Sequence, residues 1–111
     1  RAMRLSPFDP RTTGMRAGTA YAHFLLGRYD EAVSWAAMAL QDRPDYQAGL
    51  RIAAASNATA GRPEQAHQAV ARLRQLNPAL RVSNIKDLVG PWRADDLSRL
   101  EEALRQAGLP E

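Results

Sequence analysis

The chain has no cysteine, few aromatic residues and only one lysine. The absence of cysteine excludes disulfide bonds, thiolate chemistry and cysteine-based zinc sites, and it favours a reducing compartment. Only 6% of the residues are aromatic, so a core must rely on alanine and on close approach of backbone elements. No apolar run approaches the roughly 18 residues of a membrane span. No signal-peptide pattern opens the chain, and we therefore expect a cytoplasmic protein.

Acidic residues are scarce in the first three quarters of the chain. The 111 residues carry a formal net charge of +3, and 14 of the 15 cations are arginine. Through Lys86 there are 12 basic and 6 acidic residues, whereas from Asp87 onward there are 3 basic and 6 acidic. This asymmetry fits either a solvated surface or an attraction to anionic partners.

An internal repeat is the most informative feature that is present. Three features recur 34 positions later: Gly27-Arg28 as Gly61-Arg62, Ala32 as Ala66, and Pro44 as Pro78. A period of 34 with these residues is typical of a helix–turn–helix unit. Such a unit cannot bury its apolar face alone, so units stack into a solenoid.

The local signals predict an all-α chain. We expect helices over 13–26, 30–42, 46–60, from Pro63 to just before Pro78, a short one over 83–89, and a last one over 94–107. Glycines after the first, third and last of these helices supply the left-handed residue that ends them, namely Gly27, Gly61 and Gly108. The expected N-terminal caps are Thr12 or Thr13, then Asp45, then Ser83.

Apolar residues recur at helical spacing and predict the buried faces. The second and fourth helices are expected to bury Ala32, Val33, Ala36, Ala39, Leu40, Ala66, Val70, Leu73 and Leu76. The last helix is expected to bury Leu97, Leu100, Ala103, Leu104 and Ala107, while Leu109 folds back after Gly108. Its outer face carries Asp96, Arg99, Glu102 and Arg105, which suits a terminal cap with one soluble side.

With these residues the chain resembles the tetratricopeptide repeat family across roughly 13–80. The resemblance implies an α-α superhelix of antiparallel helix pairs with a C-terminal capping helix. It divides the chain into the end of an upstream repeat and its loop (1–12), two units (13–46 and 47–80), and a short helix plus capping helix (81–111). The proline that ends the upstream unit, equivalent to Pro44 and Pro78, is expected to be Pro7. Pro10 is the alternative, because it lies 34 positions before Pro44.

The segments 23–29 and 104–111 are also similar to the C-terminal repeat region behind bacterial class III nucleotide cyclase domains. That likeness implies a non-catalytic interaction or assembly module at the C-terminal end of a larger signalling protein. The partner is then a protein or peptide that lies in the groove formed by the first helices. The expected groove residues are Ala17, Tyr21, Phe24 or Leu25, Ala48, Arg51, Ala55 and Thr59.

The family's carboxylate clamp uses lysine, asparagine and arginine, and its positions fall here on Ala17, Tyr21, Ala48 and Ile52. Only Tyr21 retains a side-chain donor, so a receptor for acidic chaperone tails is not expected. No catalytic, cofactor or metal site is expected either, because His23 and His67 lie on different helices and no phosphate loop or nucleophile motif occurs.

Two further hypotheses concern association. The upstream end carries Ala2, Met3, Leu5 and Phe8, and we expect a weak homodimer with Leu5 or Phe8 near its centre, either native or caused by a missing upstream unit. The alternative function is an anion- or nucleic-acid-binding solenoid that uses Arg43, Arg51, Arg62, Arg72, Arg74 and Arg81. Because interleaved aromatic residues and a recognisable module are lacking, nucleic acid is not the expected partner.

Overall fold

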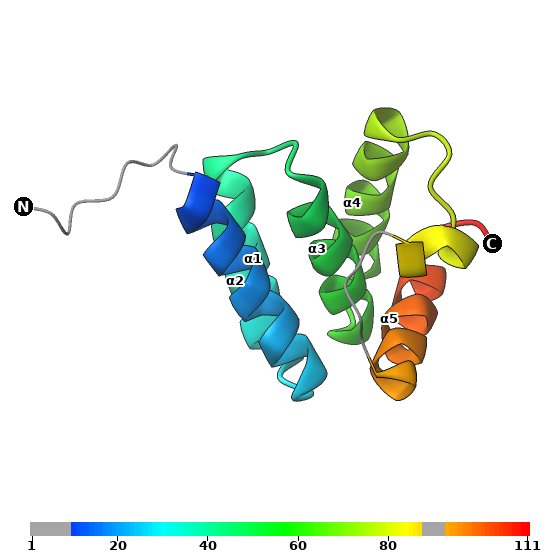
Figure 1. Ribbon diagram of the computed structural model, residues 1–111, viewed down its shortest axis with the longest axis horizontal. Coiled ribbons are helices and arrows are strands. Elements are labelled where there is room, and N and C mark those ends of the chain that lie inside the picture. The colour runs from blue at the N-terminus through cyan, green and yellow to red at the C-terminus, as the bar shows by residue number, and fades with distance from the viewer. Residues whose placement is uncertain (1–9, 88–92) are drawn as a thin grey trace, which may run out of the picture.

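The computed structural model describes residues 10–87 and 93–111, and this part of the chain is entirely helical outside its turns. Its elements are α1 (Pro10–Leu25), α2 (Tyr29–Asp42), α3 (Gln47–Thr59), α4 (Pro63–Leu76), the 3-10 helix η1 (Val82–Asp87) and α5 (Ala94–Gln106). Figure 1 shows α1 and α2 at one end of the molecule, α3 in the middle, and α4 and α5 at the other end. The all-α prediction is confirmed for these residues.

Three helices end at glycine, as predicted. Gly27, Gly61 and Gly108 have φ of 79°, 80° and 105°, a left-handed conformation that residues with a Cβ rarely adopt. After Gly27 the N–H of Arg28 donates to the carbonyl oxygen of His23 at 2.8 Å. The residues after the other two glycines make the same bond to the carbonyl oxygen five positions back, from Arg62 to Asn57 and from Leu109 to Leu104. These bonds satisfy carbonyl groups that the end of a helix leaves without partners.

The predicted N-terminal caps are wrong. α1 begins at Pro10, so Thr12 and Thr13 lie inside the helix with buried side chains and cannot cap it. Proline suits a first helical turn, because the amide that it lacks would have no partner there. α3 has no side-chain cap, and the carboxylate of Asp45 instead accepts a 2.9 Å bond from Nε of Arg72 on α4.

α3 is the central helix, and it contacts α1, α2, α4 and α5. Eight of its residues are buried in one run from Gly49 to Asn57, interrupted only by Arg51. At Gly49 the approach to α2 is close, since an added Cβ would lie 3.1 Å from Cδ2 of Leu40. A helix that packs closely against four others needs small residues at its contacts, and the alanines of α3 meet this requirement.

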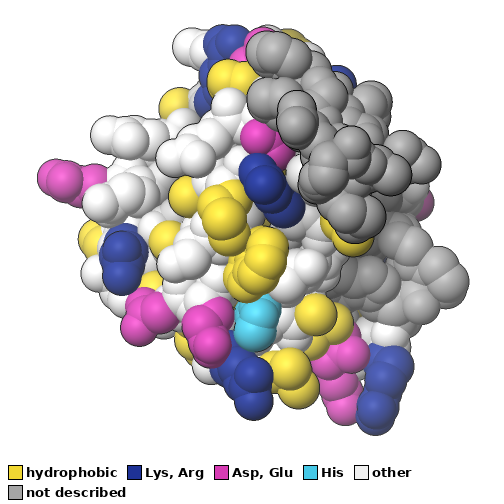
Figure 2. Space-filling view, turned by 90° about the vertical axis from the view of Figure 1, so that its left-hand side faces the viewer, with side chains coloured by type: hydrophobic (Ala, Val, Ile, Leu, Met, Phe, Trp, Pro, Cys, Tyr) yellow, Lys and Arg dark blue, Asp and Glu magenta, His cyan; other side chains and the backbone are white. Residues whose placement is uncertain are grey.

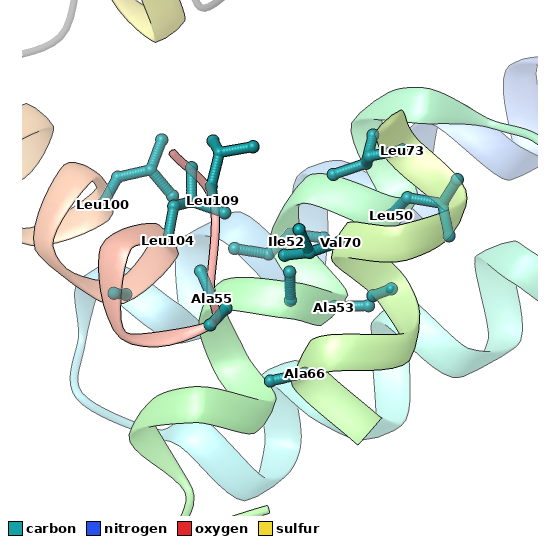
Figure 3. Close-up of a cluster of buried hydrophobic side chains, with 14 of the residues drawn as sticks. Leu50, Ile52, Ala53, Ala55, Ala66, Val70, Leu73, Leu100, Leu104 and Leu109 are labelled. Carbon is teal, nitrogen blue, oxygen red and sulfur yellow. The ribbon is translucent and has the colours of Figure 1, made fainter. Parts of the chain in front are cut away.

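The predicted apolar stripes face this helix. In α2 and α4 the buried residues are Ala32, Ala36, Ala39, Ala66, Ala69, Val70 and Leu73. Val33, Leu40 and Leu76, which were also predicted to be buried, are only half-buried. Figure 3 shows α4 and α5 contributing leucines to the core from opposite sides of α3.

The C-terminal segment turns back after Gly108 and lies against η1. The N–H of Val82 donates to the carbonyl oxygen of Pro110 at 2.8 Å, and the hydroxyl of Ser83 donates to that of Glu111 at 2.8 Å. Ser83 therefore joins two segments instead of capping a helix over 83–89, of which residues 88 and 89 lie outside the described residues. Leu109 is buried, as predicted.

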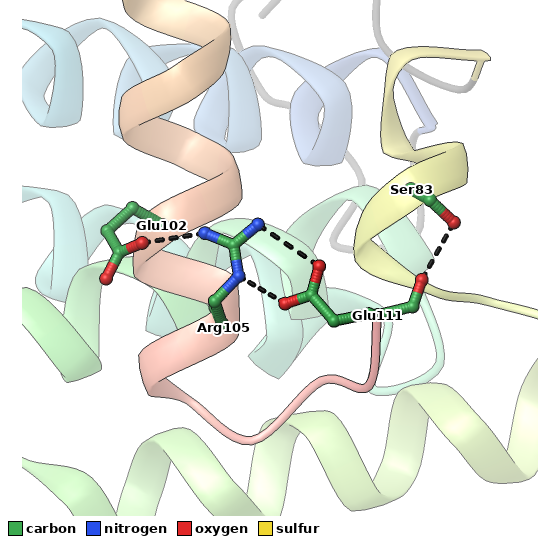
Figure 4. A network of polar contacts seen from close by, with 4 residues as sticks. All are labelled: Ser83, Glu102, Arg105 and Glu111. Carbon is green, nitrogen blue, oxygen red and sulfur yellow. Dashed lines mark hydrogen bonds and ion pairs between the residues drawn. The ribbon is translucent and has the colours of Figure 1, made fainter.

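A small ion-pair network holds this C-terminal segment (Figure 4). Arg105 pairs with the carboxylates of Glu102 and Glu111, and all three side chains are exposed. The hydrogen bond from Arg105 lowers the pKa of Glu111 below its usual value. Because the pair is exposed, its contribution to the free energy of unfolding is small.

Candidate functional site

The structure closes part of the predicted groove. Phe24 and Ala55 have exposed fractions of 1% and 0%, so the expectation that they face solvent is wrong. α5 packs along α3 with Leu100, Ala103 and Leu104, each at most 1% exposed. In Figure 3, Ala55 lies among the side chains of Leu104 and Leu109. The part of the groove nearest the C-terminal ends of α1 and α3 is therefore filled by the chain's own last helix.

Arg99 joins α5 to the end of α1. Its Nη1 donates to the carbonyl oxygen of Leu25 at 2.9 Å, and its Nη2 donates to that of Phe24 at 3.0 Å. The guanidinium carbon also lies 5.5 Å from the centre of the Phe24 ring, and Nη2 donates to the hydroxyl of Tyr29 at 3.2 Å. Arg99 was predicted to lie on the solvent face of α5; its side chain is 38% exposed, but it also bonds the end of α1.

The sequence gives no signal that sets Arg99 apart from Arg105, which lies six residues later on the same helix. Both follow an acidic residue at the third preceding position, and both pair with it, as Asp96–Arg99 and Glu102–Arg105. The acceptors that distinguish Arg99 are main-chain oxygens about 75 positions away in the sequence. Only the packing of α5 against α3 brings them together.

A cavity of about 310 Å³ remains at this junction. Its walls come from α1, α2, α3 and α5, and the lining residues are Phe24, Tyr29, Thr59, Ser98, Arg99, Glu102, Ala103 and Gln106. Thr59, a predicted groove residue, lies here, but its hydroxyl is already hydrogen-bonded to its own helix at Ala55 and Ser56. Leu25 is half-buried and packs against the core.

Tyr21 on α1 and Arg51 on α3, two further predicted groove residues, interact with each other. Both residues are half-buried, and the Tyr21 hydroxyl donates to the carbonyl oxygen of Ala48 at 3.4 Å. Burial raises the pKa of Tyr21 above its usual value of 10.0, and the charge of Arg51 and its hydrogen bond to Tyr21 oppose this rise. The structure thus brings together the two groove residues that the sequence favours as anchors for a partner.

At the end of the molecule away from α4 and α5, the surface of α1 and α2 carries an apolar hollow. It measures about 240 Å³ and is lined by Thr12, Met15, Arg16, Thr19 and Trp35. Met15 is 69% exposed, and Figure 2 shows hydrophobic side chains across this face with charged ones around them. Leu5 and Phe8, the residues predicted to mediate self-association, lie outside the described residues.

The 34-residue period relates this hollow to a buried interface. Its lining residues correspond, in order, to Tyr46, Gly49, Leu50, Ala53 and Ala69. The last four of these are buried, on the side of α3 and α4 where α2 packs. In unit two, α2 covers this face of α3 and α4. In unit one, the corresponding face of α1 and α2 is exposed to solvent at Met15.

Catalytic groups do not converge in the part of the chain that the structure describes. His23 lies on α1 and His67 on α4, and no cluster of three or more metal-ligating side chains occurs among residues 10–87 and 93–111. None of the helices described is both long and apolar enough to cross a membrane.

We compared the chain with protein-family models, with curated proteins and with solved structures, and none of the three comparisons gave a match. The residues of the chain and their geometry are therefore the basis for assigning its function.

Proposed function

We propose that this chain is a protein-interaction module of the tetratricopeptide type that has no catalytic activity of its own. The main support is that the second helices of the two pairs, α2 and α4, begin and end with similar backbone angles 34 residues apart. Arg28 and Arg62 precede α2 and α4 with ψ of 73° and 70°, and Arg43 and Asn77 follow these helices with φ of −142° and −143°. Repeated geometry on a repeated sequence supports stacked units, and stacked units form extended binding surfaces.

The partner in this proposal is a protein or peptide that contacts the half-buried residues Tyr21, Ala48 and Arg51. Tyrosine and arginine are enriched among residues that dominate binding energy. We place the module in the cytoplasm, at the C-terminal end of a bacterial signalling protein related to nucleotide cyclases. This placement rests only on the resemblance of segments 23–29 and 104–111 that the sequence suggests.

A photo-crosslinking experiment tests the proposed groove. A photoreactive residue replaces Ala48 in one sample and the exposed Arg74 of α4 in a control sample, in cells of the source organism. We expect a discrete crosslinked partner from position 48 only, and its yield should fall at least fivefold when Tyr21→Ala and Arg51→Ala are added. Identical crosslinks from positions 48 and 74 would contradict the proposal.

The alternative, a surface that binds nucleic acid or another anion, is less well supported. Four of its six arginines already have partners within the chain: Arg62 with Asp30, Arg72 with Asp45, Arg43 over the ring of Tyr46, and Arg51 with the Tyr21 hydroxyl. Titration with random DNA at two salt concentrations tests this alternative, because phosphate binding weakens steeply with salt. Tight, salt-dependent binding would favour it over the groove.

A further inference from the structure

The outer side of α1 carries a continuous stripe of apolar and small residues. Met15, Gly18, Ala22 and Leu26 follow one another at intervals of three and four residues, so they lie on one face of the helix. All four are exposed, and Met15 and Leu26 are the exposed large hydrophobic residues in the described part of the chain, at 69% and 68%. The stripe contains no charged residue, which is typical of the centre of a protein interface.

This stripe has a buried counterpart in unit two. The residues 34 positions later are Gly49, Ile52, Ser56 and Ala60. The first three are buried and the last is half-buried, because α3 packs against α1 and α2. The same face of the first helix is therefore a packing surface in unit two, whereas the described residues leave it exposed in unit one.

The apolar hollow beside the stripe contains a polar group without a partner. Thr12 lines this hollow together with Met15, Thr19 and Trp35, and it is only 8% exposed. Within the part of the chain that the structure describes, its hydroxyl has no hydrogen-bond partner. A buried polar group that is left unpaired is destabilising. This end of the molecule, which Figure 2 faces, therefore lacks both an apolar and a polar contact.

The order of residues in the stripe suits contact with a second copy of the same chain. The large residues Met15 and Leu26 lie at its two ends, and the small residues Gly18 and Ala22 lie between them. No heavy atom lies within 4 Å of the position that a Cβ would occupy at Gly18, so a second helix can approach the backbone closely there. A twofold axis at this centre places Met15 of each copy against Leu26 of the other, as a self-complementary contact requires.

This arrangement makes the two α1 helices antiparallel. The C-terminal end of one helix then lies beside the N-terminal end of the other, where the helix dipoles attract each other. Carbonyl groups in the last turn of a helix lack partners within it, and they can accept a hydrogen bond from the Thr12 hydroxyl of the second copy. The contact thus supplies the polar partner as well as the apolar cover.

We propose that two copies of this chain associate through this stripe, with antiparallel α1 helices and with Gly18 and Ala22 nearest the twofold axis. The sequence centres a homodimer on Leu5 or Phe8, and the inference moves that centre to described residues of α1. The inference is independent of the partner proposed at Tyr21 and Arg51. Two crossing helices bury less than the roughly 1,200 Å² of a standard stable interface, so the dimer is weak.

A charge exchange at residue 22 tests the interface. Ala22→Glu brings two like charges together near the axis, so we expect the dissociation constant from sedimentation to rise at least about tenfold. Ala22→Lys should have the same effect. An equimolar mixture of the two variants pairs opposite charges, and it should associate to within about threefold of the wild type. Because Ala22 is exposed, both variants should keep the wild-type circular dichroism spectrum.

Ala71→Glu is the matched control, since Ala71 is an exposed alanine on α4. It should leave the dissociation constant unchanged. A wild-type chain that stays monomeric at high micromolar concentration would overturn the inference. So would unchanged association of Ala22→Glu, or a mixture of the two charged variants that stays monomeric.

Crosslinking tests the antiparallel orientation. The chain has no cysteine, so single cysteines report one position each. Met15→Cys and Leu26→Cys chains are mixed, treated with a short bismaleimide, and analysed by intact mass. We expect products that join residue 15 to residue 26 well above the statistical mixture. Leu26→Cys mixed with Ala71→Cys is the control and should give only traces, and a majority of products between identical variants would contradict the antiparallel contact.

Discussion

Gly27 and Gly61 lie 34 residues apart and adopt the same backbone conformation, with φ of 79° and 80°. Each ends the first helix of a pair, and each is followed by an arginine whose N–H bonds five residues back at 2.8 Å. No heavy atom lies within 4 Å of the position that a Cβ would occupy at either glycine. The effect of adding a Cβ at either glycine therefore depends on the backbone conformation and not on neighbouring side chains.

Alanine at Gly27 or at Gly61 should destabilise the protein by similar amounts. A left-handed conformation costs a residue with a Cβ about 1–2 kcal/mol, and no new contact offsets this cost. We expect each variant to lose that much free energy of unfolding in urea titrations. Gly18 is the matched control, because it is exposed inside α1 with equally open space around it. Gly18→Ala should stabilise the protein by about 0.5–1 kcal/mol, and unequal losses at Gly27 and Gly61 would contradict their equivalence.

Leucine at Ala32 or Ala66 should be destabilising for a different reason. Both alanines have an exposed fraction of 0% and lie where the two helices of a pair approach each other. Overpacking such a contact costs about 1–3 kcal/mol, which thermal melting should reveal. Ala71→Leu on the exposed side of α4 is the control, with an expected change below about 0.5 kcal/mol. Melting curves that do not move for Ala32 and Ala66 would show that the repeat register is wrong.

The free energy of unfolding should fall at alkaline pH because of Tyr21. Its pKa is raised in the folded chain, mainly by burial, so the folded state holds the phenolic proton more tightly than the unfolded state does. The stabilisation is complete below about pH 10, and it is lost as the pH rises from there through the folded-state pKa. Urea titrations between pH 8 and pH 11 measure it. Tyr21→Phe should flatten the slope above pH 10, and an unchanged slope would assign it to another group.

Self-association should involve the upstream face. Leu5 and Phe8 are apolar residues of the upstream segment, and burying about 400 Å² of apolar surface is worth roughly 10 kcal/mol before the cost of association. We expect a weak dimer by sedimentation, which Leu5→Asp/Phe8→Asp abolishes. A strictly monomeric chain at high micromolar concentration rules this out, and dimers that survive the double change place the interface elsewhere. A version extended upstream by one unit separates a native dimer from one caused by a missing unit.

Zinc, ATP and cyclic nucleotides should leave the melting temperature unchanged. The two histidines lie on different helices, and the described residues contain no cluster that suits a metal ion. A ligand that binds the folded state alone raises its stability in proportion to the logarithm of its concentration. Differential scanning fluorimetry at millimolar ligand detects such a shift. A saturable rise with any of these ligands contradicts a pure interaction module.

The ends of most helices were predictable because their causes are local. Gly61 needs only the residues around it to adopt φ of 80°, and Pro63 and Glu64 suit a first helical turn wherever that helix packs. The caps at Asp45 and Ser83 failed because each side chain had a partner that was not local, whereas Thr12 and Thr13 failed because α1 begins earlier, at Pro10. Asp45 bonds Arg72 on another helix, and Ser83 bonds the main chain at Glu111.

The sequence by itself determined the helices, their period of 34 and the small residues that allow close pairing, because these depend on backbone propensity and on spacing within one helix. Only the tertiary structure decided where α5 lies. Its apolar stripe was evident, but a stripe specifies a buried face without naming the surface that buries it. That choice came from the small residues of α3 and from the carbonyl groups of Phe24 and Leu25, which Arg99 reaches only after α1, α3 and α5 have packed together.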